Sequence, residues 1–176
     1  MKIAIVSDSH DNLATAKKAI AWLNKEKIKT LLHCGDVCSP SMLRAIAKLF
    51  KGKVYLVFGN VDGDRFNMLR PKAEGKLKNV VFCGDSGEIT VAGKKIAFCH
   101  FPLTAQGLAA SKKYDFVFYG HTHRPWEEKI GKTKLVNPGT LAGMFNKATF
   151  AVYDTKTDKL ELKLVERLSP HNLMVK

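Results

Sequence analysis

Hydrophobic and polar positions along the first third of the chain predict strands and helices in alternation. Three short apolar runs, at residues 2–7, 29–34 and 53–58, have the length and composition of buried strands. Two stretches between them carry apolar residues at helical spacing: Leu13, Ala16, Ile20 and Leu23 in the first, and Met42, Leu43, Ile46 and Leu49 in the second. Strands that alternate with helices predict parallel strands joined by right-handed crossovers.

Capping residues mark the ends of these two helices. Asp11 or Asn12 stands where the first helix would begin, and either residue type caps a helix well. Ser39 followed by Pro40 has the pattern of an N-cap and a first helical residue. Gly52 is a stop signal after the second helix.

The second half of the chain has the pattern of hairpins. Residues 88–99 read as two strands around an Ala92-Gly93 turn, and residues 148–166 as two strands around a polar turn. A short helix over 104–113 and a buried strand over 115–120 are also predicted. We therefore expect an α/β fold of one domain, spanning residues 1–176, with two sheets packed face to face and helices outside.

Five predicted strands end in side chains that bind metals or protons. Because the carboxyl ends of strands in α/β sheets form the crevice where ligands bind, these side chains are expected to converge. Residues two apart in an extended segment point to the same side, so each Asp-x-His or His-x-His pair is expected to act together. The glycines at 35, 59 and 120 allow close backbone approach just before a donor. The candidates are Asp8, His10, Asp36, Asn60, His100, His121 and His123.

This mixture of carboxylate, imidazole and amide groups has too many members for one tetrahedral zinc ion. It suits two divalent cations such as Mn, Fe, Co, Ni or Zn, with Asp36 as the bridging carboxylate. Taken singly, Gly-Asp and Gly-Asn are ordinary turns, and a histidine at a strand end is often a core residue. Taken together, a buried cluster of this kind is costly without a cation.

The ordered motifs D-x-H, GD, GN, H and GHTH resemble the calcineurin-like metallophosphoesterase superfamily. With Asn137-Pro138-Gly139-Thr140, the chain is most similar to the compact bacterial and archaeal phosphodiesterases, over roughly residues 1 to 165. The resemblance implies a four-layer α/β/β/α sandwich that commonly forms homodimers or homotetramers. It implies two divalent cations, manganese foremost and magnesium among the options, and hydrolysis of a phosphodiester by in-line attack of a metal-bound hydroxide.

The same resemblance implies a ligand set for each ion and a catalytic role for Asp36 and Asn60. One metal would be held by Asp8, His10, Asp36 and His123, and the other by Asp36, Asn60, His100 and His121.

Two positions depart from the pattern of the superfamily. Val61-Asp62 stands where larger members have a histidine that protonates the leaving group, so water or Asp62 is predicted to supply that proton. Phe101-Pro102 follows His100 where the compact family usually has H-G-H, so we expect an unusual substrate surface there.

Three neighbouring residues are weaker candidates for the site. His33 is predicted to orient a ligand or to be a core histidine, and Asp11 to flank the site or to cap a helix. Arg124 is a candidate contact for the substrate phosphate.

The net charge of +13 favours an anionic partner. The lysines are scattered rather than clustered, so a small phosphodiester is predicted in preference to nucleic acid; a small nuclease is one alternative. A non-catalytic scaffold resembling the retromer subunit of this fold is another.

The sequence has no CxxC spacing and no long apolar segment, which predicts free cysteines, no membrane span and a cytoplasmic location.

Overall fold

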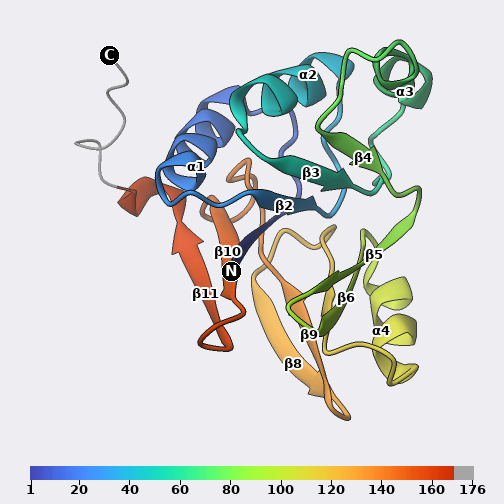
Figure 1. Ribbon diagram of the computed structural model, residues 1–176, viewed down its shortest axis with the longest axis vertical. Helices are drawn as coiled ribbons and strands as arrows, with labels where there is room; N and C mark the ends of the chain where they lie inside the picture. The colour runs from blue at the N-terminus through green and yellow to red at the C-terminus, as the bar shows by residue number, and fades with distance from the viewer. Residues whose placement is uncertain (169–176) are drawn as a thin grey trace.

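Two β-sheets packed face to face form the centre of the computed structural model, which describes residues 1–168 (Figure 1). The six-stranded sheet has the order β11 (Lys159–Leu164), β10 (Thr149–Asp154), β1 (Lys2–Val6), β2 (Thr30–His33), β3 (Lys53–Leu56) and β4 (Val80–Phe82). The five-stranded sheet has the order β5 (Ser86–Val91), β6 (Lys94–Cys99), β7 (Phe116–Phe118), β9 (Thr133–Asn137) and β8 (Trp126–Ile130).

Both sheets combine parallel and antiparallel strands. Strands β1, β2, β3 and β4 run parallel to one another, as the alternation of strands and helices predicts for the first three. The β10–β11 hairpin joins this sheet through antiparallel pairing of β10 with β1. In the other sheet β6, β7 and β9 are parallel, and β5 and β8 are antiparallel strands at the two edges.

Helices cover the outer faces of both sheets and complete the four layers. Helices α1 (Leu13–Lys25), α2 (Pro40–Leu49) and α3 (Arg65–Ala73) lie on the side of the six-stranded sheet, and α4 (Pro102–Ala110) lies on the other (Figure 1). A single turn of 3-10 helix, Val165–Arg167, follows β11. The predicted α/β/β/α sandwich with two mixed sheets is confirmed.

The alternation of side chains along β1 shows why this strand is apolar on both faces. Ile3 and Ile5 pack into the core between the two sheets, whereas Ala4 and Val6 pack into the core beneath α1 and α2. Successive strand residues point to opposite faces, so a strand covered on both sides must be apolar throughout. Aromatic residues fill much of the core between the sheets; its largest members are Phe98, Phe116, Phe118 and Tyr153.

The N-cap predictions are confirmed for both long helices, and α2 ends at Leu49 with Phe50 as its C-cap, before Gly52. The Asn12 side chain accepts a hydrogen bond from the Thr15 amide, and the Ser39 hydroxyl accepts one from the Met42 amide. Asn12, not Asp11, is therefore the cap of α1. The Ala92-Gly93 turn has positive φ at both residues, 50° and 80°, as a two-residue hairpin turn requires.

Several elements differ from the sequence prediction. Helix α4 begins at Pro102 rather than at Thr104, because Pro102 takes the first helical position. The apolar pattern gave no signal for β8, an edge strand in which four of five residues are exposed. Also absent from the prediction are α3, β4 and β9.

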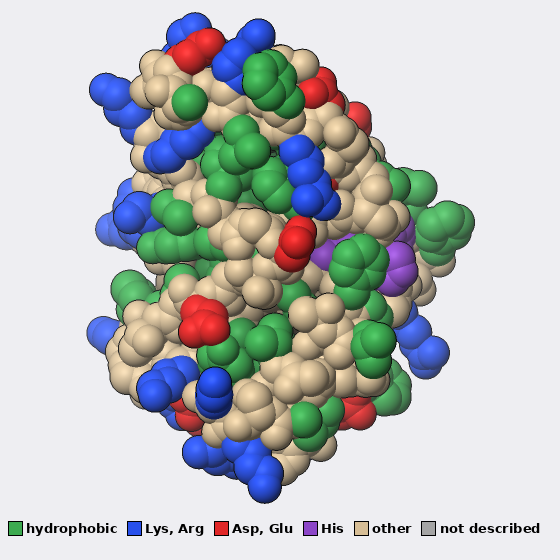
Figure 2. All heavy atoms as spheres, turned by 90° about the vertical axis from the view of Figure 1, so that its right-hand side faces the viewer, with side chains coloured by type: hydrophobic (Ala, Val, Ile, Leu, Met, Phe, Trp, Pro, Cys, Tyr) green, Lys and Arg blue, Asp and Glu red, His purple; other side chains and the backbone are tan. Residues whose placement is uncertain are grey.

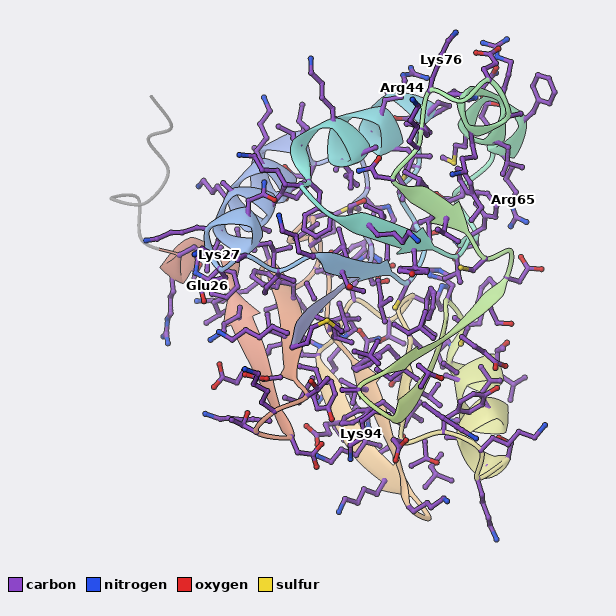
Figure 3. All side chains as sticks on the ribbon, viewed as in Figure 1. Glu26, Lys27, Arg44, Arg65, Lys76 and Lys94 are labelled. Atoms are coloured by element: carbon purple, nitrogen blue, oxygen red, sulfur yellow. The ribbon has the colours of Figure 1, made fainter. Side chains whose placement is uncertain are left out.

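The cysteines and charged residues lie as their sequence pattern indicates. Cys34, Cys38, Cys83 and Cys99 are all free. The basic side chains labelled in Figure 3 come from separate parts of the chain: Arg44 lies on α2, Lys94 on β6 and Lys76 in the loop between α3 and β4. Within residues 1–168, no helix has the length and apolar character needed to cross a membrane.

Candidate metal centre

The carboxyl ends of five strands bring the seven predicted metal ligands to one place. Strands β1, β2 and β3 contribute from one sheet, and β6 and β7 from the other. The backbone amide of His121 lies 3.2 Å from both carboxylate oxygens of Asp8, and its Nδ1 atom lies 2.9 Å from the amide oxygen of Asn60. Residues that follow β1, β3 and β7, from both sheets, therefore lie at a single site.

One group of candidate ligands consists of Asp8, His10 and His123. Their ligand atoms all lie within 4.8 Å of one another. The Nε2 atoms of the two histidines are 3.0 Å apart, and they lie 3.9 and 3.5 Å from Asp8 Oδ1. Asp8 is fully buried, so its charge has little access to water.

A second group consists of Asp8, Asp36 and His100, whose ligand atoms also lie within 4.8 Å of one another. Asp36 Oδ2 lies 3.4 Å from His100 Nε2 and 3.7 Å from His10 Nε2. One oxygen of Asp36 therefore faces a histidine of each group, and Asp8 belongs to both groups. His100 Nε2 also lies 2.9 Å from the side-chain oxygen of Asn60, which extends the second group toward His121.

The contacts of the outer ring nitrogens set the tautomers of two histidines. His100 Nδ1 lies 2.8 Å from the Cys34 carbonyl oxygen, and His123 Nδ1 lies 3.4 Å from that of Met144. A carbonyl oxygen only accepts hydrogen bonds, so Nδ1 carries the proton in both rings. In the neutral ring Nε2 then directs its lone pair into the site, which is the usual arrangement of a metal-binding histidine.

When His100 and His123 are neutral, several side-chain atoms that face one another in the site accept hydrogen bonds and do not donate them. His123 Nε2 faces the Asp8 carboxylate, and His100 Nε2 faces the Asn60 oxygen. Acceptors this close repel one another unless a cation or additional protons lie between them. A mixed set of carboxylate oxygens, imidazole nitrogens and an amide oxygen suits borderline divalent cations. The residues present therefore fit divalent metal ions.

The pKa shifts reflect the same crowding. Burial raises the pKa of Asp8 above its ordinary value. Burial also opposes ionisation of Asp36, but contacts from His100 and the Val61 amide outweigh it, so the Asp36 pKa is lowered. Burial likewise disfavours the charged form of His100, yet the adjacent Asp36 carboxylate outweighs this effect and raises the His100 pKa. Asp36 and His100 thus stabilise each other's charged forms.

The backbone turns sharply at most of the candidate ligands. The φ angles of Asp8 and His10 are 52° and 37°, and those of His121 and His123 are 69° and 59°. The two residues of each pair do lie at one site, but the predicted reason is wrong. The segments are not extended, because left-handed residues turn the chain. Asp36, with φ of 58°, shares this conformation. Such strain clusters at functional sites and persists only where surrounding contacts hold it.

Two of the predicted glycines are required by close packing against the acidic ligands. A Cβ atom on Gly59 would collide with the Asp36 carboxylate and would lie 2.6 Å from the Asp36 amide nitrogen. A Cβ atom on Gly120 would collide with the Ser7 hydroxyl and would lie 2.8 Å from Asp8 Oδ2. These glycines let strands of both sheets approach the carboxylates closely.

Asp62 has contacts that differ from those expected of a proton donor. Its carboxylate accepts hydrogen bonds from the backbone amides of Asp36, Cys38 and Gly59, at 3.0, 2.8 and 2.7 Å, and the residue is 2% exposed. A proton donor must direct an O–H group toward the substrate, whereas both oxygens here accept bonds from the protein. These contacts favour a role in ordering the two loops that carry Asp36 and Asn60.

The three weaker candidates occupy different surroundings. His33 is fully buried, and its Nε2 atom lies 3.1 Å from the Ser9 hydroxyl, which in turn lies 3.5 Å from the Asp36 carbonyl oxygen. Burial lowers the pKa of His33 to about 4, so the ring is neutral at pH 7. His33 thus supports the loop of Asp36 through Ser9.

Asp11 and Arg124 make contacts outside the ligand cluster. Asp11 Oδ1 accepts hydrogen bonds from the amide and hydroxyl of Ser39, the N-cap of α2, at 3.2 and 2.6 Å. The Arg124 guanidinium lies 5.7 Å from the ring centroid of Trp126. This cation–π contact gives the guanidinium a protein partner and does not support the predicted phosphate contact.

Other supporting residues were not assigned a role from the residue pattern. Asn137 is buried and donates to the Gly120 carbonyl oxygen at 2.8 Å, and Thr140 donates to the Asp8 carbonyl oxygen at 3.0 Å. Cys38 Sγ lies 3.4 Å from His10 Nδ1. Only the N-P-G-T motif marked two of these positions in the sequence, and hydrogen bonds to backbone atoms leave no periodic signal.

Comparison with known proteins identifies the family of the chain. The model of the calcineurin-like phosphoesterase superfamily domain matches residues 1–158. The chain belongs to this superfamily. All of the candidate ligands lie within the matched residues, so this metallophosphoesterase domain contains the whole candidate metal centre.

Individual proteins resemble the chain over nearly its full length. Phosphodiesterase MJ0936 of Methanocaldococcus jannaschii is 31% identical, with 89% of this chain and 94% of that protein aligned. A solved structure described as a novel archaeal phosphodiesterase matches with a TM-score of 0.83 and 27% identity, covering 93% and 99% of the two chains. Vps29 of Chaetomium thermophilum matches with a TM-score of 0.69 at 14% identity, covering 93% and 95%, which shows the common fold.

Proposed function

We propose that this calcineurin-like phosphoesterase hydrolyses small phosphodiesters and binds two divalent cations to do so. The observation that carries the proposal is the position of the Asp36 carboxylate, with one oxygen 3.7 Å from His10 Nε2 and 3.4 Å from His100 Nε2. A carboxylate between two groups of nitrogen ligands has the position of a bridge between two ions.

Each cation would be held by one side of the cluster. Asp8, His10, Asp36 and His123 would hold the first, and Asp36, Asn60, His100 and His121 the second. When bound, two such ions lower the pKa of coordinated water and neutralise charge on the phosphoryl oxygens during in-line displacement. Manganese is the first candidate, with nickel, cobalt, iron, zinc and magnesium as alternatives.

The protein's own residues would position the substrate and the ligands. The carbonyl contacts of His100 and His123 fix which ring nitrogen faces the site. Asp62 keeps the loops of Asp36 and Asn60 in register through its bonds to backbone amides. Water is then the proposed source of the leaving-group proton. The similarity to phosphodiesterase MJ0936 supports a diester as the substrate.

Hydrolysis of bis(4-nitrophenyl) phosphate tests the proposal. Protein stripped with a chelator would be assayed after addition of Mn, Ni, Co, Fe, Zn or Mg in turn, and bound metal would be counted by mass spectrometry. We expect activity with about two ions per chain, and loss of both in Asp36→Ala. Asp85→Ala is the matched control, because Asp85 is exposed and its carboxylate pairs with Arg65. Full metal-dependent activity in Asp36→Ala would contradict the proposal.

A non-catalytic scaffold is the second candidate, because Vps29 shares the fold. This function predicts that no divalent ion supports turnover of diesters or monoesters, while the chain binds a larger assembly stably. Assembly of this chain as a homodimer or homotetramer is a separate proposal, which light scattering would test.

A further inference from the structure

Two exposed phenylalanines stand against the histidines of the candidate metal centre. The Phe101 ring lies 5.0 Å from the ring centroid of His100 and 5.2 Å from that of His121. The Phe145 ring lies 5.4 Å from the centroid of His123. Phe101 therefore borders the group that contains His100, and Phe145 borders the group that contains His123. Figure 2 shows hydrophobic side chains directly against the histidines at the molecular surface.

The position of Phe101 gives little advantage to the fold. Phe101 is the N-cap residue of α4 and makes no side-chain capping bond, although serine, threonine, asparagine or aspartate would supply one. The residue remains 43% exposed, so it also gains only part of the stabilisation available to a buried aromatic side chain. Local stability therefore does not account for an aromatic residue here.

Phe145 is still less favourable for the fold. It is 87% exposed, and its φ angle of 62° is a left-handed conformation that bulky residues rarely adopt. Glycine or asparagine would satisfy this backbone at lower cost. An exposed aromatic side chain on strained backbone beside a candidate metal ligand is better explained by contact with a ligand than by folding.

Flat apolar surfaces on either side of the centre match the shape of a diester that carries planar rings. A phosphodiester has two ester groups, and a phosphoryl group held by the metal ligands would send one group toward each side. Val61 and Met144, 42% and 41% exposed, are further apolar residues next to Asn60 and Phe145 in the chain. A polar aliphatic ester would gain little from such surroundings, whereas a nucleobase stacks on aromatic rings whatever its sequence.

We propose that Phe101 and Phe145 are specificity-determining residues that stack on nucleobases, so that the substrates are small nucleoside phosphodiesters. This inference rests on the proposed phosphodiesterase function. Hydrolysis would add one water molecule across a P–O ester bond, giving a phosphomonoester and an alcohol. The two phenylalanines would act on binding of the ester groups and not on the bond that breaks.

Two substrates with the same leaving group isolate the contribution of the base. Thymidine 5′-(4-nitrophenyl phosphate) and methyl 4-nitrophenyl phosphate both release 4-nitrophenolate and differ in the other ester group. In the wild-type protein with its active metal, we expect kcat/KM to be about 10-fold higher for the thymidine ester, from the typical strength of one base–aromatic stack. In the double variant Phe101→Leu/Phe145→Leu, this ratio should fall close to one.

Single variants and a control identify the source of the preference. Phe101→Tyr and Phe145→Tyr keep an aromatic ring and should keep the ratio, whereas the leucine variant of the phenylalanine on the side of the thymidine group should lower it. Phe66→Leu is the matched control, because Phe66 is an exposed phenylalanine on α3, and its ratio should equal that of the wild type. Thermal melts verify folding of every variant.

Equilibrium binding gives a readout that does not depend on turnover. Calorimetry with thymidine 5′-monophosphate and with inorganic phosphate should show a preference for the nucleotide that the double variant loses. An equal ratio in wild-type protein and the double variant, or a wild-type ratio near one, would overturn the stacking proposal; the first result would also be expected if the rings dock a protein. Absence of hydrolysis of both esters would instead count against the phosphodiesterase function itself.

Discussion

A substitution at Asp62 can distinguish a structural role of this residue from a catalytic one. Its Oδ2 atom accepts hydrogen bonds from the amides of Asp36 and Gly59, and its Oδ1 atom accepts one from the amide of Cys38. In Asp62→Asn one oxygen becomes an NH2 group, which cannot accept a hydrogen bond. The best orientation of the new side chain keeps its oxygen on Asp36 and Gly59 and turns its NH2 group toward the Cys38 amide.

The cost of this substitution follows from the bond that is lost. A hydrogen bond to a charged group contributes about 1.5–3 kcal/mol, and a buried donor left without a partner costs about 1–3 kcal/mol. Because the two effects overlap in one contact, we expect Asp62→Asn to lower the free energy of unfolding by about 3 kcal/mol. For a chain of this size, that loss corresponds to a fall in Tm of roughly 6–12 °C.

Asp64→Asn is the matched control, because the same chemical change is made two residues away. Asp64 caps α3 by accepting a bond from the Asn67 amide, and asparagine caps helices about as well as aspartate. Its free energy of unfolding should stay within about 0.5 kcal/mol of the wild-type value. Urea unfolding with a chelator present would measure both variants without a contribution from bound metal.

The result that would refute this reasoning is a stable Asp62→Asn protein. If its unfolding matched that of Asp64→Asn, the three amide contacts would contribute little. If kcat also fell and the basic limb of its pH–rate profile disappeared, Asp62 would be the proton donor after all. A loss of stability with a pH–rate profile of unchanged shape supports the loop-ordering role.

Three other outcomes follow from the site. A divalent cation that fits it, Mn²⁺ first, should raise stability by about 2.7 kcal/mol at 100 times its Kd, and EDTA should reverse this rise in differential scanning fluorimetry. Gly120→Ala should destabilise the protein by about 1–3 kcal/mol through overpacking against Ser7 and Asp8, measured by urea unfolding. Asn137→Ala leaves the Gly120 carbonyl and the Gly139 amide without their side-chain partner, so urea unfolding should show a loss of about 2–4 kcal/mol; an unchanged midpoint would contradict this.

The strand ends were predictable because parallel strands place their carboxyl ends at one edge of a sheet. Apolar runs located β1, β2, β3, β6 and β7, and the polar residue after each run was therefore a good candidate. The periodic pattern carried no information on the turns beyond those ends. Asp8 and His10 face one site because of left-handed backbone, which no local sequence rule for an extended segment anticipates.

Two of the elements that the sequence did not reveal bury few side chains. Helix α3 buries only Met68 and Pro71, and its proline contradicts the usual composition of a helix interior. Strand β8 pairs with β9 through its backbone while its side chains remain mostly exposed. Similarly, the support that Asp62 gives to Asp36 runs through backbone amides, so it depends on tertiary contacts that periodicity does not encode.

Strain at the ligands and stability from the surrounding fold are linked in this molecule. Asp8, Asp36 and His121 are held in left-handed backbone, which costs on the order of 1–2 kcal/mol at each residue. The hydrogen bond that Thr140 donates to the Asp8 carbonyl oxygen and the one that the Asp36 amide donates to the Asp62 carboxylate hold this geometry in place. A cation between the converging acceptors would remove their mutual repulsion and bind without reorganising the loops. Because the fold already holds these groups in position, little conformational free energy would be lost when a cation binds. Metal affinity should therefore depend on the stability of the loops that carry the ligands.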